Sequence, residues 1–183
     1  MYSDNTLTAK EAIRLCALGT LAQGPLPYGA LAQEVRSFVS HVAGPLLELM
    51  GSSIELLKYE ALVKVVDGEG IEADSRLAIT EAGRRGLREL LTANLRGGTS
   101  ELNKLIIALK FRFLHLLEAN EQRAQAELLI EACDNELARL EALRSTHAKD
   151  GGFFVEWLDH DIGLLEQRLE WLTAFRRRLV GQA

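Results

Sequence analysis

The side chains with the clearest potential for chemistry are the histidines and the carboxylates beside them. The four histidines stand at positions 41, 115, 147 and 160, and none has the His-Glu-x-x-His spacing that places two imidazoles on one helix face for zinc. Asp159-His160-Asp161 is the nearest approach to a metal or acid–base cluster. Because adjacent residues of a helix point in different directions, this triplet does not predict a shared site.

Cysteine chemistry and phosphate chemistry are equally weakly indicated. Cys16 and Cys133 are far apart, and neither belongs to a Cys-x-x-Cys pair, so we expect neither a disulfide nor a zinc site. Both fall in apolar helical patterns, which predicts buried, reduced packing residues. The sequence has no Gly-rich phosphate loop after a predicted strand and no Gly-x-Ser-x-Gly elbow. We therefore expect no enzyme, no metal and no cofactor.

The two tryptophans are the best candidates for a ligand site. Trp157 and Trp171 are 14 residues apart, which is about four helical turns, so they line the same side of a helix. Phenylalanines stand close to them at positions 153, 154 and 175. Two interpretations stay open: the indoles seal a helical hairpin as core residues, or they form the wall of an effector pocket.

Composition describes an ordinary globular protein with an acidic balance. The chain has 183 residues, 48% of them apolar and 26% charged, with a net charge of −5. Residues 1–95 hold 9 Lys and Arg against 12 Asp and Glu, and residues 96–183 hold 12 against 14. Neither half is basic, which weakens an expectation of nucleic-acid binding from charge alone.

Targeting signals are not expected. Met1–Lys10 has neither the apolar core of a signal peptide nor an Arg-rich presequence. The most apolar stretch, Leu102–Leu117, contains three basic residues and is too short to span a bilayer. We expect a cytoplasmic protein without a membrane partner.

Capping and breaker residues predict three helices near the start of the chain. Thr8-Ala-Lys-Glu11 has the capping-box spacing, and Gln23-Gly24-Pro25 ends the helix that it opens. A second helix buries the face formed by Leu31, Val35, Phe38, Val39 and Val42, and Gly44-Pro45 ends it. Ser52 and Glu55 repeat the capping-box spacing, so a third helix is expected to run to about Leu62.

The periodicity then changes from helix to strand. Val63, Val65 and Val66 are β-branched, Asp67–Gly70 is a turn, and Leu77–Ile79 can return as the partner strand. Thr80-Glu81 caps a further helix to about Leu95. Three helices followed by a two-stranded wing and a helix make up a winged helix-turn-helix, so residues 1–95 are expected to form a DNA-binding domain.

The rest of the chain is predicted to be almost entirely helical, which makes the fold class mainly α. Arg96–Ser100 resembles a hinge, and Asp150-Gly151-Gly152 separates a long helix from a last helix over 154–180. In that last helix apolar residues are spaced alternately by four and three, with Arg176 completing the series: Leu158, Ile162, Leu165, Leu169, Leu172 and Leu179. Residues 96–183 are thus expected to form an antiparallel long-helix dimerisation arm; a monomeric hairpin is the alternative.

One stretch carries a family resemblance. The sequence Leu77-Ala-Ile-Thr-Glu-Ala-Gly-Arg-Arg-Gly-Leu87 resembles the strand-to-helix junction of winged-helix repressors, the PadR family best of all. The first helix ending in Leu21-Ala-Gln-Gly-Pro-Leu26, Gly51-Ser52 at the recognition helix and the C-terminal pair of long helices agree with that family. The resemblance implies a dimeric repressor whose winged helices occupy two half-sites of a double-stranded DNA operator, with a small aromatic ligand as inducer.

The chain departs from the family's pattern at the surface expected to meet DNA. Tyr28-Gly29 inverts the usual pair, Ser53-Ile54-Glu55 replaces an apolar residue, Tyr and Pro, and the wing over 67–75 carries four acids and no base. The residues that remain available for DNA contacts are Ser52, Ser53, Lys58, Lys64 and Arg76. For each of these residues the alternative interpretation is a solvated surface residue that makes no DNA contact. The competing function is a winged-helix protein-interaction module that does not bind DNA specifically.

Overall fold

The computed structural model describes residues 6–44, 50–67, 73–96 and 100–181, and of residues 50–53 it describes the backbone only. The expected turn at Gly68–Gly70, the glycines of the hinge, the apolar segment before Met50 and the side chains of Ser52 and Ser53 lie outside these residues. Contacts divide the chain into two compact units, Met1–Leu117 and Glu118–Ala183. They are called the first and the second unit below.

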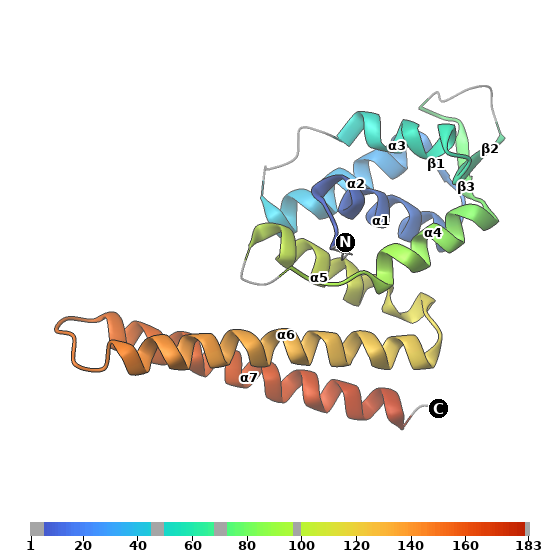
Figure 1. The fold of residues 1–183 in the computed structure, drawn as a ribbon. Coiled ribbons are helices and arrows are strands. Elements are labelled where there is room, and N and C mark those ends of the chain that lie inside the picture. The colour runs from blue at the N-terminus through green and yellow to red at the C-terminus, as the bar shows by residue number, and fades with distance from the viewer. Residues whose placement is uncertain (1–5, 45–49, 68–72, 97–99, 182–183) are drawn as a thin grey trace, which may run out of the picture. The chain divides into compact units, whose positions relative to one another are not determined.

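Helix α1 (Ala9–Ala22) is the centre of the first unit. Its N-terminus has the expected capping box: the backbone N–H of Thr8 donates to Glu11 Oε2 at 2.7 Å, and the Glu11 N–H donates to Thr8 Oγ1 at 3.3 Å. Ile13, Leu15 and Leu18 have no exposed surface. Around α1 pack α2 (Tyr28–Ala43), α3 (Met50–Tyr59), α4 (Glu81–Thr92) and α5 (Glu101–Phe113) (Figure 1).

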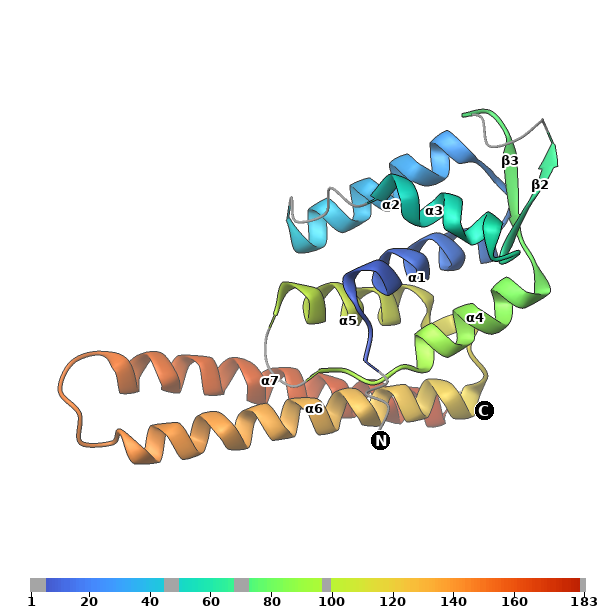
Figure 2. The same cartoon turned by 45° about the horizontal axis from the view of Figure 1, so that its top comes forward.

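A small antiparallel sheet completes the first unit (Figure 2). It contains β1 (Leu26–Pro27), β2 (Val63–Asp67) and β3 (Arg76–Ile79) in the order β1-β3-β2. The pair β2–β3 is the expected wing, with Val63 opposite Ile79 and Val65 opposite Leu77. Strand β1 adds a third strand that the sequence does not predict. The helix order and the wing confirm the predicted winged-helix fold.

The third helix differs at both ends from its predicted bounds. It begins at Met50, so Ser52 lies inside the helix and not at its N-cap as expected. It ends at Tyr59, before the predicted end near Leu62. Ala61 has a φ of 56°, in the left-handed region, and this residue turns the chain from α3 into β2.

Helix α5 belongs to the first unit, beyond the boundary expected at residue 95. Arg112 Nη2 donates to Glu34 Oε1 of α2 at 2.6 Å, and its guanidinium lies 4.4 Å from the centre of the Phe38 ring. Lys110 reaches the end of α4, where its Nζ donates to the carbonyl oxygens of Leu91 at 2.6 Å and Ala93 at 2.7 Å. The first unit therefore ends at Leu117, just after the short 3₁₀ helix over 114–116 that follows α5.

Because Lys110 is buried, we expect the free energy of unfolding to rise at alkaline pH. Its side chain has no exposed surface, and burial lowers its pKa from the ordinary 10.5 to about 8. Between these two values the unfolded chain binds the proton more often, so the free energy of unfolding rises with pH. At about 1.4 kcal/mol per pKa unit, the full rise is about 3 kcal/mol. Urea unfolding from pH 7 to 10.5 should show this rise, and Lys110→Met should lack it; parallel profiles would contradict the assignment.

The second unit is a pair of long antiparallel helices, α6 (Ala119–Thr146) and α7 (Phe154–Val180) (Figures 1 and 2). This confirms the predicted helix pair. Leu158, Leu165 and Leu172 of α7 are buried, and Cys133 Sγ of α6 donates to the Leu165 carbonyl oxygen at 3.5 Å. None of the helices in the described segments is both long and apolar enough to cross a bilayer.

Several of the aspartate, histidine and cysteine side chains considered for chemistry form ion pairs or hydrogen bonds, or are buried, within the fold. Asp159 forms an ion pair with Arg144, and this hydrogen bond lowers the pKa of the Asp159 carboxyl. His147 Nδ1 lies 2.6 Å from Asp150 Oδ2. Cys16 and Cys133 are free and buried, as expected, and burial raises the pKa of Cys16 to about 12. Among the described residues, no three His, Cys, Asp or Glu side chains are grouped so that they could hold a metal ion.

Candidate nucleic-acid interface

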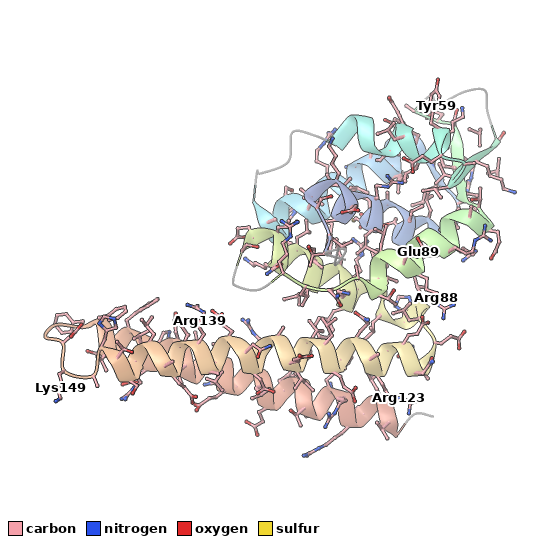
Figure 3. The ribbon with its side chains drawn as sticks, viewed as in Figure 1. Tyr59, Arg88, Glu89, Arg123, Arg139 and Lys149 are labelled. Carbon is pink, nitrogen blue, oxygen red and sulfur yellow. The ribbon has the colours of Figure 1, made fainter. Side chains whose placement is uncertain are left out.

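Helix α3 has one buried face and one exposed face. Ile54 and Leu57, three residues apart, are 2% and 0% exposed and fix the helix to the core. On the outer side Leu56 is 48% exposed and Tyr59 is 93% exposed. Figure 3 shows Tyr59 pointing away from the helices of the first unit. The outer side of α3 thus leaves two large side chains, Leu56 and Tyr59, open to solvent.

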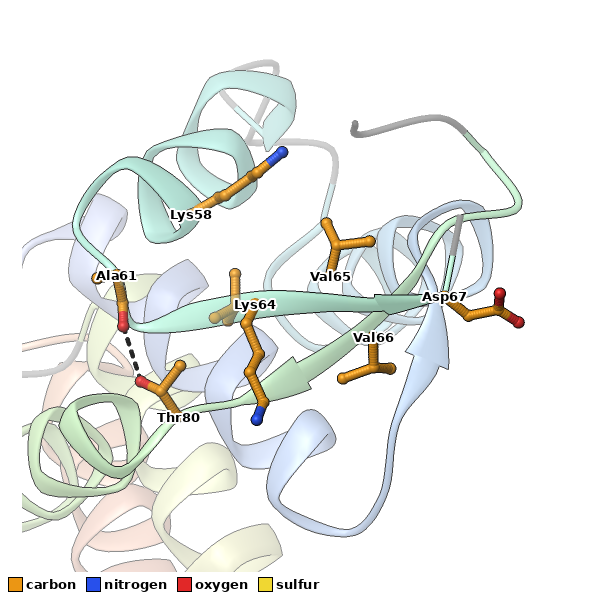
Figure 4. A pocket seen from close by; sticks show the side chains of 8 residues that line it. Lys58, Ala61, Lys64, Val65, Val66, Asp67 and Thr80 are labelled. Carbon is orange, nitrogen blue, oxygen red and sulfur yellow. Dashed lines mark hydrogen bonds between the residues drawn. The ribbon is translucent and has the colours of Figure 1, made fainter. Parts of the chain in front are cut away.

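A shallow groove lies between the end of α3 and strand β2 (Figure 4). Its lining includes Lys58 of α3, Lys64 and Val66 of β2, and Thr80 before α4. The two lysines come from different elements, and Figure 4 shows their side chains on opposite sides of β2. The structure therefore brings two of the expected DNA-binding residues to one place and points their charges in different directions.

Thr80 holds the base of this groove together. Its Oγ1 donates to the Ala61 carbonyl oxygen at 2.7 Å and accepts from the backbone N–H of Gly83 at 3.0 Å. One hydroxyl thus caps α4 and ties it to the turn between α3 and β2. Thr80 is the first residue of the Thr-Glu-Ala-Gly run that carries the family resemblance. Within the fold, the Thr80 hydroxyl of this run holds the start of α4 to the turn that precedes β2.

The charge around α3 is less acidic than its sequence indicates. Glu60, directly after the helix, forms an ion pair with Arg14 of α1. Arg36 of α2 is exposed, and its charge acts on Tyr28 together with that of Glu55. The pKa of the Tyr28 hydroxyl is raised by burial first and by Glu55 second, whereas Arg36 lowers it. Arg36 is an exposed base of α2, the helix that packs against α3, and sequence reasoning missed it. Its position next to buried Val35 was the available signal.

Arg76 has a different neighbourhood. It is exposed at the start of β3, and its Nη2 donates to the Pro25 carbonyl oxygen at 3.1 Å. The side chain thus links β3 to the residue just before β1. Ser52 and Ser53 lie in the first turns of α3 by their backbone. A DNA contact from any of these three residues stays a prediction.

The expected dimerisation residues fall into two groups. Leu158, Leu165 and Leu172 are buried within the single chain, whereas three more are half-buried: Ile162, Leu169 and Leu179. The single chain thus already covers part of the seam predicted to meet a second copy.

The two tryptophans are half-exposed on α7, and each stacks on a phenylalanine. Trp157 is 53% exposed and its ring centre lies 5.9 Å from that of Phe154; Trp171 is 49% exposed and lies 5.5 Å from Phe175. A groove between α6 and α7 includes Leu137, Glu166 and Arg177 in its lining, and neither indole lines it. The effector pocket stays a prediction.

Comparison with known proteins identifies the family. A family model described as AphA-like transcriptional regulator matches residues 2–176. No curated protein matches the chain.

Solved structures with a similar chain trace are PadR regulators. The PadR-like transcriptional regulator BC1756 from Bacillus cereus is 16% identical, with a TM-score of 0.40, and the match covers 93% of this chain and 99% of that one. Bacillus subtilis PadR in complex with operator DNA is 14% identical, with a TM-score of 0.36 and coverages of 91% and 98%. Bacillus subtilis PadR in complex with p-coumaric acid is 15% identical, with a TM-score of 0.35 and coverages of 92% and 98%. Because the family model spans nearly its whole length, this chain belongs to the AphA-like transcriptional regulators, and its recognition as a PadR-like regulator is confirmed.

Proposed function

We propose that this chain is a dimeric repressor that presents two copies of α3 to an operator. The observation that carries the proposal is the outer face of α3, which stands beside a groove holding Lys58 and Lys64. An α-helix fits the major groove of B-DNA, and lysines placed beside such a helix can contact the phosphates on either side. DNA binding is assigned to the part of the first unit over residues 1–95, and dimerisation to the helical part of residues 96–183.

The proposed DNA contacts are of two kinds: contacts to phosphates position the protein, and contacts to base edges distinguish the DNA sequence. Lys58, Lys64 and Arg36 are the bases available to phosphates, with Arg76 and the first turn of α3, including Ser52 and Ser53, as further contacts. Leu56 and Tyr59 are placed for base edges, where an apolar side chain distinguishes thymine by its methyl group. With few bases and several acids nearby, binding to unrelated DNA should be weak. Specific binding should then depend strongly on base contacts.

The experiment is a mobility-shift assay with the DNA upstream of the chain's own gene, over a range of salt concentrations. The proposal expects a complex with this DNA that unrelated DNA of equal length does not compete away, and an affinity that falls as salt rises. The absence of a specific complex at every salt concentration would overturn it. A reporter under this promoter tests repression, because removing the regulator should then raise expression.

Lys58→Ala and Lys64→Ala should each reduce the salt dependence of operator binding. A lysine that neutralises one phosphate releases its counterion, so its loss should lower the slope of log affinity against log salt by about 1. Fluorescence anisotropy with labelled operator measures the slope. Lys104→Ala is the control, because Lys104 lies on α5 beside Glu101 at 3.8 Å. If both variants kept the wild-type slope, these lysines would not face phosphates.

A protein-interaction module is the second candidate, and a specific observation favours it. Leu56, Tyr59 and Val66 are large apolar side chains exposed near the groove, and Glu55 and Asp67 are exposed acids close to them in sequence. Such a surface also suits a protein partner. Tyr59→Ala separates the candidates: it should weaken a DNA complex in the first case, and in the second it should release a defined protein that co-purifies with the chain.

We extend the proposal to an inducer with an aromatic ring. The support is the pair of half-exposed stacks, Phe154–Trp157 and Trp171–Phe175, on the helix expected to set the dimer. Because the chain has two tryptophans, both on α7, intrinsic fluorescence reports directly on this helix. Titration with p-hydroxycinnamic acids should quench it and release operator; unchanged fluorescence and an intact complex would reject this inducer class.

A further inference from the structure

The outer face of α3 carries an acidic side chain, Glu55, at the place proposed to meet DNA. Glu55 is exposed and lies four residues, about one helical turn, before Tyr59, so the two side chains share a side of the helix. Glu60, just beyond the end of α3, is held by its ion pair with Arg14. No described residue forms a hydrogen bond or an ion pair with the Glu55 carboxylate. The charge of Glu55 is therefore available to whatever this face binds.

A carboxylate on a helix that enters the major groove is unfavourable unless it finds a hydrogen-bond donor there. The phosphates on either side repel it, and contact with DNA removes the water that solvates it. Much of the groove floor repels it as well, because guanine presents N7 and O6, thymine presents O4, and all three atoms are acceptors. Only the amino groups of cytosine and adenine donate in this groove. Glu55 therefore rejects most bases at the position that it faces and accepts one with an amino group.

Of the two bases with an amino group, cytosine fits a carboxylate better. The N6 amino group of adenine stands beside N7, an acceptor that would face the second carboxylate oxygen, whereas cytosine presents its N4 amino group without an acceptor next to it. The neighbours of Glu55 on the outer face are Leu56 and Tyr59, which have no positive charge to compete with the base for the carboxylate. The geometry of the helix and the chemistry of its side chains thus favour one base.

We propose that Glu55 determines the DNA specificity of this chain by accepting a hydrogen bond from the amino group of a cytosine in each half-site. The proposal rests on the DNA-binding function above and names a base and the atom through which it is read. The same acid that weakens binding to DNA in general then widens the difference between the operator and unrelated DNA. Base discrimination by Glu55 thus compensates for the scarcity of bases around α3.

Substitutions of Glu55 test which base it reads. The probe is the upstream DNA fragment, with each base pair of the protected region replaced in turn by the other three, and anisotropy measures each affinity. In the wild type, one position of each half-site should prefer cytosine over guanine and thymine by at least about fivefold. Glu55→Gln supplies an amide that pairs with N6 and N7 of adenine, so the preference at this position alone should move from cytosine to adenine. Glu55→Ala should abolish the preference at this position and leave the other positions unchanged.

Two controls separate base reading from a change in charge or in folding. Glu89 is an exposed acid of α4, and Figure 3 shows it well apart from Tyr59, so Glu89→Gln should keep the wild-type preference at every position. Urea unfolding should give both Glu55 variants the wild-type free energy of unfolding, because the Glu55 side chain is exposed.

The outcomes distinguish this proposal from the DNA-binding function itself. If the wild type binds the upstream DNA specifically but both Glu55 variants keep its base preferences, or change the affinity for every DNA alike, the reading of cytosine is overturned and the regulatory function stands. A wild type that forms no specific complex overturns both.

Discussion

Alanine in place of Gly83 is expected to lower the free energy of unfolding by about 2 kcal/mol or more. A Cβ at this position would lie 2.1 Å from the Leu62 carbonyl oxygen and 2.7 Å from Ile79 Cγ1. The first of these is backbone, so helix α4 would have to move away from the turn that joins α3 to β2. Overpacking of this kind costs about 1–3 kcal/mol, occasionally more, and the better helix propensity of alanine returns only up to about 1 kcal/mol.

Gly86 provides a matched control on the same helix. A Cβ there meets only Leu62 Cδ2, at 3.9 Å, which is ordinary contact. Gly86→Ala should therefore raise the free energy of unfolding by up to about 1 kcal/mol through helix propensity alone. Urea unfolding of both variants gives opposite shifts of the midpoint if α4 packs against the Leu62 carbonyl as described. Shifts of the same sign would contradict that packing.

Breaking the dimer is expected to have the largest effect on operator binding. In a dimer, the second α3 binds its half-site from a high effective concentration, which typically strengthens binding by 10²- to 10⁴-fold. Leu164 of α7 is 49% exposed, so Leu164→Asp should break pairing through this helix and leave the helix pair of the single chain intact. The monomeric variant should therefore bind a complete operator at least 100-fold more weakly than wild type. Its affinity for an isolated half-site should be unchanged, because the first unit is not altered.

Anisotropy titrations with complete and half operators measure both affinities. Glu170→Arg, which changes an exposed charge of the same helix, should bind both DNAs as wild type does. A monomeric Leu164→Asp that still bound the complete operator at full strength would contradict the role of pairing in recognition.

Those parts of the fold that depend on neighbouring residues could be predicted from the sequence. The capping box at Thr8 and Glu11, the cap at Thr80 and the long helices of the second unit are encoded within a few turns of chain. The wing follows from β-branched residues in Val63–Val66. Strand β1 has only two residues and no periodicity of its own, so its pairing with β3 depends on the three-dimensional arrangement.

Contacts between segments that are distant in sequence account for the differences between the predicted and the observed fold. The bonds of Lys110 to Leu91 and Ala93, and of Arg112 to Glu34, place α5 in the first unit, and no local pattern announces them. Helix α7 has large apolar residues on more than one side, and the sequence alone does not tell which side packs against its own chain. Burial of Leu158 and exposure of Trp157, one residue apart, make that distinction.

The candidate interface shows the same division. Lys58 and Lys64 could be predicted as neighbours because the sequence predicts the helix and the strand that carry them. Arg36 becomes a candidate for the interface only when α2 packs beside α3, which no local pattern predicts. The ion pair of Arg14 with Glu60 likewise reduces an acidity that the sequence overstates. Counting charges along the chain therefore overstated the free acidity around α3.

Hydroxyl-radical footprinting on the upstream DNA tests the central claim most directly. Two α3 helices presented by one symmetric dimer should protect two matching half-sites, related by a dyad and separated by a whole number of helical turns, about 10–10.5 base pairs each. Protection should disappear from both half-sites together when salt is raised. A single protected site without a dyad, or no protection at concentrations where the chain is a dimer, would contradict the account.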